Sequence, residues 1–412
     1  MKVLFLSPDF VIPTESGLRV RTLSQLKLLA DVEQVTEITL LSLSATDVPA
    51  ERRRALEKLV PKLRVEEPIV RPLRIRQGVR TFADFLKKRV LRRLPYLIAV
   101  NDCARMHRIV EAELRRTDYD VVYFGYLGVM AYYDLVRKLS PRARCILEEH
   151  NIEWQIFDRL APTLKSPLRY VAELEARALR EYERDALTKC DAVIAISETD
   201  AQLLRTLSGA TVTVVPPFVE TRQRPAIVTD RPKLTYFGHL TWQPNVLGLD
   251  WFCSEVWPKV LSSIADATLT IAGPGLRPGP DAQLIVPDAW KRPGIHTVGF
   301  VDDLDDLYRE TRVVVAPVHG GSGVRMKILE TLSAGMPTIT TSDGAAGLAL
   351  RDGQEVLIAD DPTAFAAGVI RLLSDADFRQ RLSDCGYEYI NRYHAKSSTR
   401  RCLASALGAR DP

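Results

Sequence analysis

The chain has 412 residues, enough for two domains with complete cores, and its 46% hydrophobic and 26% charged residues are ordinary for a soluble globular protein. A net charge of +4 excludes little, but six scattered cysteines without a Cys-x-x-Cys pair argue against a zinc site or a disulfide framework. No apolar run approaches the ~20 residues that span a bilayer, and the N-terminus has too short an apolar core for a signal peptide. We therefore expect a cytoplasmic protein, or one peripheral to the inner face of a membrane.

The N-terminal half alternates buried β runs with amphipathic helices. Residues 2–6 predict a strand, and Gly17 lies in the loop before a helix. This order opens a doubly wound α/β domain, and the absence of GxGxxG disfavours a dehydrogenase. Further elements are predicted as strands at 38–43, 62–66, 120–124, 145–147, 192–196 and 211–215, and as helices at 50–60, 129–139 and 167–189.

Residues 71–93 form a basic segment. It contains nine Lys or Arg residues against one acid, Asp84, interleaved with apolar residues. A basic amphipathic helix of this kind can lie on an anionic membrane surface. It can equally be a solvated helix whose apolar side packs on its own domain, and both interpretations stay open. We expect no nucleic-acid binding, because no recognised module surrounds the segment.

His150 follows the expected strand at 145–147 almost directly. The carboxyl end of a strand is where α/β sheets place their ligands, although a single histidine is more often structural. Glu148, Glu149 and Glu153 crowd around it. We expect these carboxylates to be solvated and not catalytic.

A proline-rich stretch without periodicity divides the chain. We assign 1–216 to an N-terminal domain, 217–232 to a linker, 233–388 to a second domain and 389–412 to a C-terminal helix. The second domain repeats the alternation, with strands predicted at 234–237, 267–272, 313–316, 338–341 and 356–359, a strand that ends at 298–301, and helices at 249–260, 363–373 and 377–389. Acids at 302–306 open a further helix, and capping and the helix dipole explain them without a metal.

The stretch HGGSGVRMKILETLSAGMP, residues 319–337, carries the strongest functional signal. Its glycines make a turn after a buried strand, and a helix is predicted from Val324 with Gly335 as its stop. Arg325 and Lys327 then lie in the first turn, where each basic residue is unfavourable by ~0.3–1 kcal/mol. A bound anion, held by glycine amides and both cations, explains this arrangement.

Glu330 lies three residues after Lys327, on the same helix face. A carboxylate beside a phosphate site cannot bind the phosphate, but it can accept hydrogen bonds from the paired hydroxyls of a ribose. Phosphate and ribose together indicate a nucleotide. The alternative is a solvated helix face after an ordinary turn.

The same stretch resembles the donor-binding motif of family 4 glycosyltransferases, retaining enzymes of the GT-B fold. The resemblance implies two Rossmann-like doubly wound domains facing across a cleft, with the C-terminal helix crossing back to the first. It implies that Glu330 holds the ribose of a nucleotide-sugar and that His150 lies next to the transferred sugar. It also implies that Gly17 lies over the donor phosphates, and that the backbone around Phe300 reads the base.

The chain departs from the family pattern at three positions. Ser322 stands where the family usually has a glutamate that contacts the donor sugar, and His239 and Asn245 replace an arginine and a lysine that grip the pyrophosphate. This pattern is similar to a subgroup of exopolysaccharide-type sugar transferases. Arg325 and Lys327 are expected to neutralise the pyrophosphate instead. The donor site thus expected also includes Gly321, Ser322, Gly323 and Val324.

The implied function is retaining, metal-independent transfer of a sugar from a nucleotide-diphosphate sugar to a hydroxyl acceptor, without a cofactor. The acceptor would be a glycan, a lipid-linked glycan or a small molecule, received by the first domain. Two alternatives stay open. One is a catalytically inactive GT-B scaffold protein, which the departures favour. The other is a nucleotide-sugar epimerase or hydrolase, for which no carboxylate acid/base pair can be placed.

Overall fold

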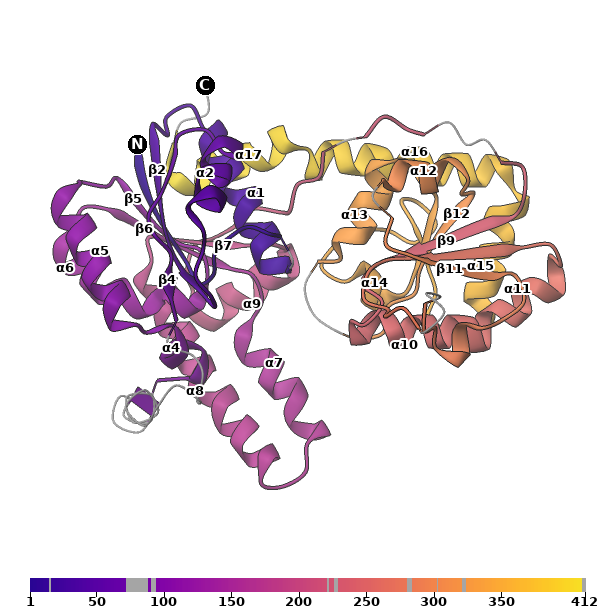
Figure 1. Cartoon of the computed structure of the whole chain (residues 1–412), viewed down its shortest axis with the longest axis horizontal. Helices are drawn as coiled ribbons and strands as arrows, with labels where there is room; N and C mark the ends of the chain where they lie inside the picture. The colour runs from indigo at the N-terminus through magenta and orange to yellow at the C-terminus, as the bar shows by residue number, and fades with distance from the viewer. Residues whose placement is uncertain are drawn as a thin grey trace. The chain divides into compact units, whose positions relative to one another are not determined.

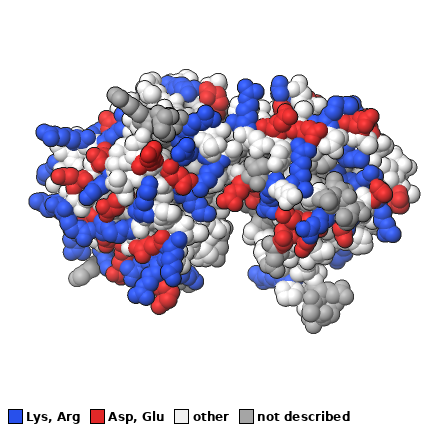
Figure 2. All heavy atoms as spheres, turned by 90° about the horizontal axis from the view of Figure 1, so that it is seen from above, with Lys and Arg blue, Asp and Glu red and all other residues white. Residues whose placement is uncertain are grey.

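The computed structural model describes residues 1–14, 16–71, 88–89, 94–220, 222–225, 229–279, 284–301, 303–320 and 324–409. The chain divides into two compact units, one formed by Met1–Pro217 with Ser397–Pro412 and the other by Phe218–Lys396. Each unit contains one central sheet with helices packed around it (Figure 1). Acidic and basic side chains are interspersed over the face drawn in Figure 2.

The first unit is built on a parallel sheet of strand order β3-β2-β1-β5-β6-β7-β8, with β4 paired to the end of β2. Its central strands are continuous apolar runs because helices cover both faces of such a sheet. The order reverses between β1 and β5, which is where ligands bind in open α/β sheets. The strands are β1 Lys2–Ser7, β2 Glu37–Ser44, β3 Leu63–Val65, β4 Ile69–Val70, β5 Val121–Phe124, β6 Arg144–Glu149, β7 Ala192–Ala195 and β8 Val212–Val214.

The helices of this unit agree with the predictions except in the middle of the domain. The prediction of one α-helix over 129–139 is wrong in its first half, because apolar spacing does not distinguish a 3₁₀ turn from an α-helix. Two helices over 96–116 were not predicted. The helices are α1 Gly17–Asp31, α2 Ala50–Leu59, α4 Tyr96–Asn101, α5 Ala104–Arg116, the 3₁₀ helix η2 Leu127–Tyr132, α6 Tyr133–Leu139, α7 Glu153–Leu160, the 3₁₀ helix η3 Ala161–Thr163, α8 Leu168–Lys189, α9 Glu198–Ser208 and α17 Lys396–Leu407.

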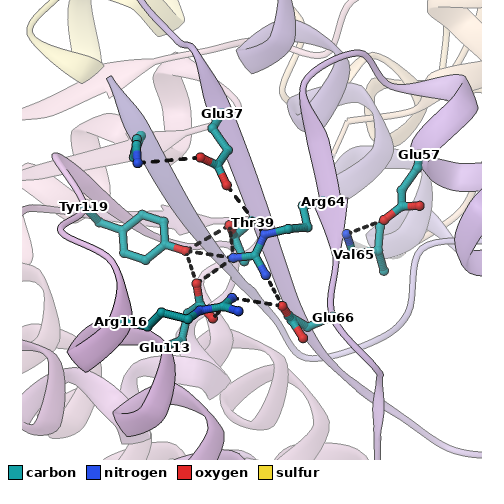
Figure 3. A network of polar contacts seen from close by, with 10 residues as sticks. Glu37, Thr39, Glu57, Arg64, Val65, Glu66, Glu113, Arg116 and Tyr119 are labelled. Atoms are coloured by element: carbon teal, nitrogen blue, oxygen red, sulfur yellow. Dashed lines mark hydrogen bonds and ion pairs between the residues drawn. The ribbon is translucent and has the colours of Figure 1, made fainter.

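A polar network ties the edge of this sheet to α5 (Figure 3). Arg64 donates to Glu113 at 2.6 Å and to Thr39 at 3.0 Å, and the hydroxyl of Tyr119 donates to the same Glu113 carboxylate. Burial alone would raise the pKa of Glu113, but Tyr119 and Arg64 outweigh it and lower this pKa. The network therefore fixes β2 and β3 to α5 through an ionised carboxylate.

The last helix, α17, belongs with the first unit although it follows the second along the chain. Arg144 of β6 donates to the carbonyl of Ala406 at 3.2 Å, and Arg400 donates to the carbonyl of Asp31 at 3.4 Å. None of the helices in the described part of the chain is both long and apolar enough to cross a membrane.

Most of the basic segment at 71–93 lies outside the described residues, so its two interpretations stay predictions. The structure describes only Arg71, Lys88 and Arg89 of its basic side chains. Arg71 lies 3.7 Å from a carboxylate oxygen of Asp9, and Arg89 lies 2.6 Å from one of Glu175. Lys88 lies 4.0 Å from a carboxylate oxygen of Asp102.

The second unit contains a parallel sheet of order β11-β10-β9-β12-β13-β14, which reverses between β9 and β12. Its strands are β9 Lys233–Phe237, β10 Thr268–Ala272, β11 Ile295–Gly299, β12 Val313–Ala316, β13 Thr338–Thr340 and β14 Leu357–Ile358. Its helices are α10 Gln243–Trp251, the π-helix η4 Phe252–Val256, α11 Trp257–Ser263, the 3₁₀ helix η5 Asp288–Trp290, α12 Leu304–Arg309, α13 Met326–Ser333, α14 Ser342–Ala345, α15 Pro362–Ser374, α16 Ala376–Tyr389 and the π-helix η6 Ile390–His394.

Candidate active site

A cavity of about 620 Å³ lies in the second unit, between the carboxyl ends of β9 and β10 and the start of α13. A cavity of this size suits a small-molecule ligand. It brings together several residues that the sequence predicted separately, namely His239, Phe300, Val324, Arg325, Lys327 and Glu330. Gly321, Ser322 and Gly323 lie outside the described residues, so their roles stay predictions.

Helix α13 begins two residues later than predicted. Arg325 is the N-cap residue with extended backbone, so only Lys327 lies in the first turn, and the prediction that placed both there is wrong for Arg325. No side chain caps the helix and no acid lies in its first turn, so its positive end is not neutralised by the described residues. Arg325 stacks 5.2 Å from the ring centre of Trp242 at the same end of the helix.

Lys327 is a desolvated cation at this helix start. Its ammonium group donates to the side-chain oxygen of Asn245 at 2.7 Å and to the hydroxyl of Tyr236 at 2.9 Å. Within the described ranges no carboxylate forms an ion pair with it. Burial, reinforced by the charge of Arg325, lowers the pKa of Lys327 to about 7. A desolvated ammonium without a counter-ion favours a bound anion.

Glu330 supplies an acceptor on the same cavity wall. Burial raises the pKa of its carboxyl, while the charge of Arg222 acts in the opposite direction. The described part of the chain provides no hydrogen bond or ion pair to this side chain. It is therefore available to hydroxyl groups of a ligand.

Two glycines make the cavity floor. Gly273 has φ +146°, and a Cβ there would lie 1.8 Å from the carbonyl oxygen of Gly238. A Cβ on Gly238, which has φ +155°, would lie 2.8 Å from the Lys327 ammonium nitrogen. Gly273 donates its N–H to the carbonyl of Gly299 at 2.6 Å. The backbones of Gly238, Gly273 and Gly299 therefore come together at the ends of β9, β10 and β11.

Aromatic side chains border the cavity near Phe300, where the family resemblance implies that the nucleotide base binds. Phe300 follows the end of β11 and is 67% exposed, and Trp242 is 41% exposed. His239 is exposed and its ring bonds Thr241 at 3.0 Å. The sequence missed Trp242 and Arg222 as lining residues, because they come from a loop and a linker without a local motif.

The acids at 303–306 serve the structure. Asp303 caps α12 by accepting from the N–H of Asp305, and Asp305 pairs with Arg222 at 2.9 Å. Asp306 pairs with Arg309 at 2.7 Å. No group of three His, Cys, Asp or Glu side chains among the described residues is arranged to hold a metal ion.

In the first unit, His150 lies above a buried carboxylate at the end of β6. Glu148 accepts from Arg21 at 2.7 Å, from Gln25 at 2.8 Å and from the Tyr123 hydroxyl at 2.8 Å. Burial would raise the pKa of Glu148, but Arg21, His150 and Tyr123 outweigh it and lower this pKa to about 2. The resulting anion lies 3.6 Å from Nε2 of His150. Arg21 and Gln25 reach it from α1 and were not predicted.

The expectation of solvated carboxylates around His150 is wrong. Glu148, Glu149 and Glu153 are 0%, 1% and 4% exposed. Residues of α1 contact Glu148, and Glu183 of α8 accepts the N–H of Glu153 at 3.2 Å. Burial and the neighbouring acids raise the pKa of Glu149 well above its usual range. Burial likewise raises the pKa of Glu183, a residue of α8, to about 8. Glu149 and Glu183 are therefore held in their neutral form.

Gly17 is the first residue of α1, after the N-cap Ser16. A Cβ at Gly17 would meet no atom within 4 Å, so nothing in the described first unit requires a glycine there. Gly17 and His150 both belong to the first unit, whereas the cavity at α13 belongs to the second.

Two protein-family models match the chain, one in each half. The model described as Glycosyltransferase Family 4 matches residues 81–223, and the model described as Glycosyl transferases group 1 matches residues 231–375. An uncharacterised 44.6 kDa protein of the cps region of Klebsiella pneumoniae is 25% identical over 158 residues, which are 38% of this chain and 40% of that protein. A phosphatidyl-myo-inositol mannosyltransferase of Mycobacterium leprae is 29% identical over 143 residues, which are 34% of this chain and 37% of that protein. The chain thus matches about two fifths of each relative.

Solved structures share the whole fold at low identity. Sucrose-phosphate synthase of Thermosynechococcus elongatus has a TM-score of 0.67 and 13% identity, with 98% of both chains covered. Anabaena HepE in complex with UDP has a TM-score of 0.66 and 13% identity, covering 99% of this chain and 100% of that one. WaaG, a glycosyltransferase involved in lipopolysaccharide biosynthesis, has a TM-score of 0.62 and 13% identity, with coverage of 99% and 100%. These likenesses establish the two-domain architecture.

Proposed function

Because the chain belongs to glycosyltransferase family 4 and has the GT-B fold, we propose that it transfers a sugar from a nucleotide-diphosphate sugar to a hydroxyl acceptor, with retention at the anomeric carbon. The observation that carries the proposal is the charge pattern at α13. A desolvated ammonium, Lys327, lies one helical turn from Glu330 on one cavity. A diphosphate and a ribose carry the complementary groups.

The transfer step needs positive charge where the leaving diphosphate develops its own negative charge. Lys327, Arg325 and the uncapped start of α13 supply it in a partly desolvated site, where each interaction is stronger than in water. We propose that these groups replace a metal ion in this role. The leaving oxygen takes the proton of the acceptor hydroxyl as the new glycosidic bond forms, so no protein nucleophile is required.

We propose that His150 lies beside the transferred sugar. The ionised Glu148 places a negative charge 3.6 Å from Nε2 of this imidazole. The carbonyl group next to His150 would stabilise the positive charge that develops on the sugar ring. Under this proposal the first unit receives the acceptor and the second holds the donor.

A nucleotide-sugar panel tests the proposal. Uridine donors come first, because HepE has been solved with UDP and with UDP-glucose. The expected result is a rise in melting temperature with one donor, followed by a sugar–acceptor product. A donor that binds without any turnover indicates a scaffold protein, and a free altered sugar without acceptor indicates an epimerase or hydrolase. Lys327→Met is the matched negative control.

A further inference from the structure

The α7–α8 hairpin projects from the rest of the first unit (Figure 1). Of the fifteen large hydrophobic side chains that are exposed among the described residues, six lie within residues 156–174 of this hairpin. They are Ile156, Leu160, Leu168, Tyr170, Val171 and Leu174, and their exposed fractions run from 39% to 63%. Single exposed apolar residues need no explanation, but a cluster of this kind marks an interaction surface.

The outer face of helix α8 is apolar in its first half and charged in its second half. Its inner face is buried throughout, through residues such as Ala172, Leu179 and Leu187. Tyr170 and Leu174 lie one turn apart on the opposite, exposed face. Eleven residues further on, about three turns, the same face carries the exposed charges of Glu181 and Asp185. The apolar outer face is therefore confined to the projecting end.

A row of arginines begins where the apolar face ends. Arg177, Arg180 and Arg184 are exposed and spaced three and four residues apart, so they share one side of α8. Within the described ranges no carboxylate forms an ion pair with any of the three. They line a groove of about 530 Å³ between α8 and α9, where Arg180 stacks 5.0 Å from the ring centre of Trp154. Among the described residues that line this groove, Glu181 is the one acid.

We propose that this hairpin docks the protein on an anionic phospholipid bilayer, with residues 156–174 inserted at the acyl boundary and the arginine row against the headgroup phosphates. The dimensions agree. A helix rises 1.5 Å per residue, so Arg177 and Arg180 lie about 4.5 and 9 Å beyond Leu174. The headgroup layer of one leaflet is roughly 5–8 Å thick, and interfacial helices bury their apolar side to a depth of ~5–10 Å.

The charge of the hairpin favours an anionic bilayer over a second copy of the chain as its partner. A two-fold dimer through the hairpin would bring two identical rows of unpaired arginines together. The acids near the tip do not offset them, because Glu173 is already paired with Arg169 at 2.9 Å. Glu173 is half-buried, and Asp158 is exposed. A phospholipid bilayer complements both parts, because its acyl boundary accommodates the apolar side chains and its headgroup phosphates bind the arginines.

Vesicle sedimentation tests the proposal on the full chain, with phosphatidylcholine vesicles that contain about one-third phosphatidylglycerol and with pure phosphatidylcholine vesicles. The tip variant is Leu168→Ser/Val171→Ser/Leu174→Ser, and its control is Leu59→Ser/Leu247→Ser/Ile285→Ser at similar exposure. The row variant is Arg177→Gln/Arg180→Gln/Arg184→Gln. Its control is Arg52→Gln/Arg54→Gln/Arg105→Gln, which removes three exposed arginines elsewhere.

The expected result is binding to the anionic vesicles only, weakened by on the order of a hundredfold in the row variant and at least about tenfold in the tip variant, with both controls unchanged. Val171→Ser alone replaces the tip variant if the triple change does not fold. Unchanged binding in both variants would assign the membrane contact to residues 71–93 and overturn the proposal. Equal binding to pure phosphatidylcholine, no vesicle binding, or a dimer lost in the tip variant would overturn it as well.

Discussion

The pKa of Lys327 predicts how donor affinity depends on pH. In the free protein this pKa is about 7, so roughly nine tenths of the ammonium is charged at pH 6 and one tenth at pH 8. A bound diphosphate favours the charged form and raises the pKa by ~1–3 units. If only the charged form binds well, the affinity for a nucleotide-diphosphate sugar falls about tenfold between pH 6 and pH 8.

Isothermal titration calorimetry measures this directly. A nucleotide-sugar is the suitable ligand, because its pyrophosphate diester does not titrate between pH 6 and pH 8. At pH 8 the complex is expected to take up close to one proton, seen as a binding heat that changes with the ionisation enthalpy of the buffer. Lys327→Met is expected to bind weakly at every pH and to lose the dependence.

The exposed imidazole of His239 lines the same cavity and is a second basic side chain beside the ligand site. His239→Gln is therefore the control, and it is expected to keep the tenfold change. A wild-type affinity that stays constant from pH 6 to pH 8 would refute the reasoning. A pH dependence that disappears in His239→Gln and persists in Lys327→Met would refute it too.

Four further outcomes follow from the same contacts. Lys327→Met is expected to raise the melting temperature of the free protein at pH 7. The pKa of Lys327 in the folded state lies below its unfolded value of 10.5, so the cost of desolvating the ammonium is fully present below pH 7. A lower melting temperature would indicate a purely structural lysine. Glu330→Gln is expected to weaken a ribonucleotide-sugar about tenfold and to leave its 2′,3′-dideoxy analogue unaffected in calorimetry; equal losses would exclude contact with the ribose. Gly273→Ala is expected to lower the melting temperature by several degrees and to abolish donor binding, because its Cβ would lie 1.8 Å from the Gly238 carbonyl, whereas Gly17→Ala, with no atom within 4 Å, serves as the control in scanning calorimetry. For Glu183 the folded pKa of about 8 exceeds the unfolded value of 4.5, so the folded state binds more protons and its stability falls as pH rises from 4.5 to 8. In urea unfolding at pH 5 and pH 8, Glu183→Gln is expected to lose less stability between the two pH values than the wild type. An equal loss would contradict the burial argument.

The architecture followed from the sequence because its signals are local. Central strands such as β1 and β12 are continuous apolar runs, and parallel sheets bury such runs on both faces. The placement of Lys327 and Glu330 on one cavity was predicted for the same reason, because the two residues are neighbours on one helix. The start of this helix was misplaced because the glycines at 320, 321 and 323 indicate a turn but not the residue at which helical geometry begins.

The remaining features depend on contacts between distant segments. Tyr236 and Asn245 reach Lys327 from 91 and 82 residues away and carry no motif of their own. The carboxylates beside His150 resemble a solvated loop in the sequence. They are buried in the structure, where Arg21 of α1 contacts Glu148, and Glu183, on a helix 30 residues later, accepts the N–H of Glu153. No pattern along the chain encodes that approach.

A crystal structure of the full chain with UDP or the best-binding nucleotide-sugar tests the central claim most directly. The diphosphate is expected within about 3 Å of the Lys327 ammonium, and the ribose hydroxyls at the same distance from the Glu330 carboxylate. A nucleotide bound elsewhere, with the cavity at α13 unoccupied at saturating concentration, would contradict it.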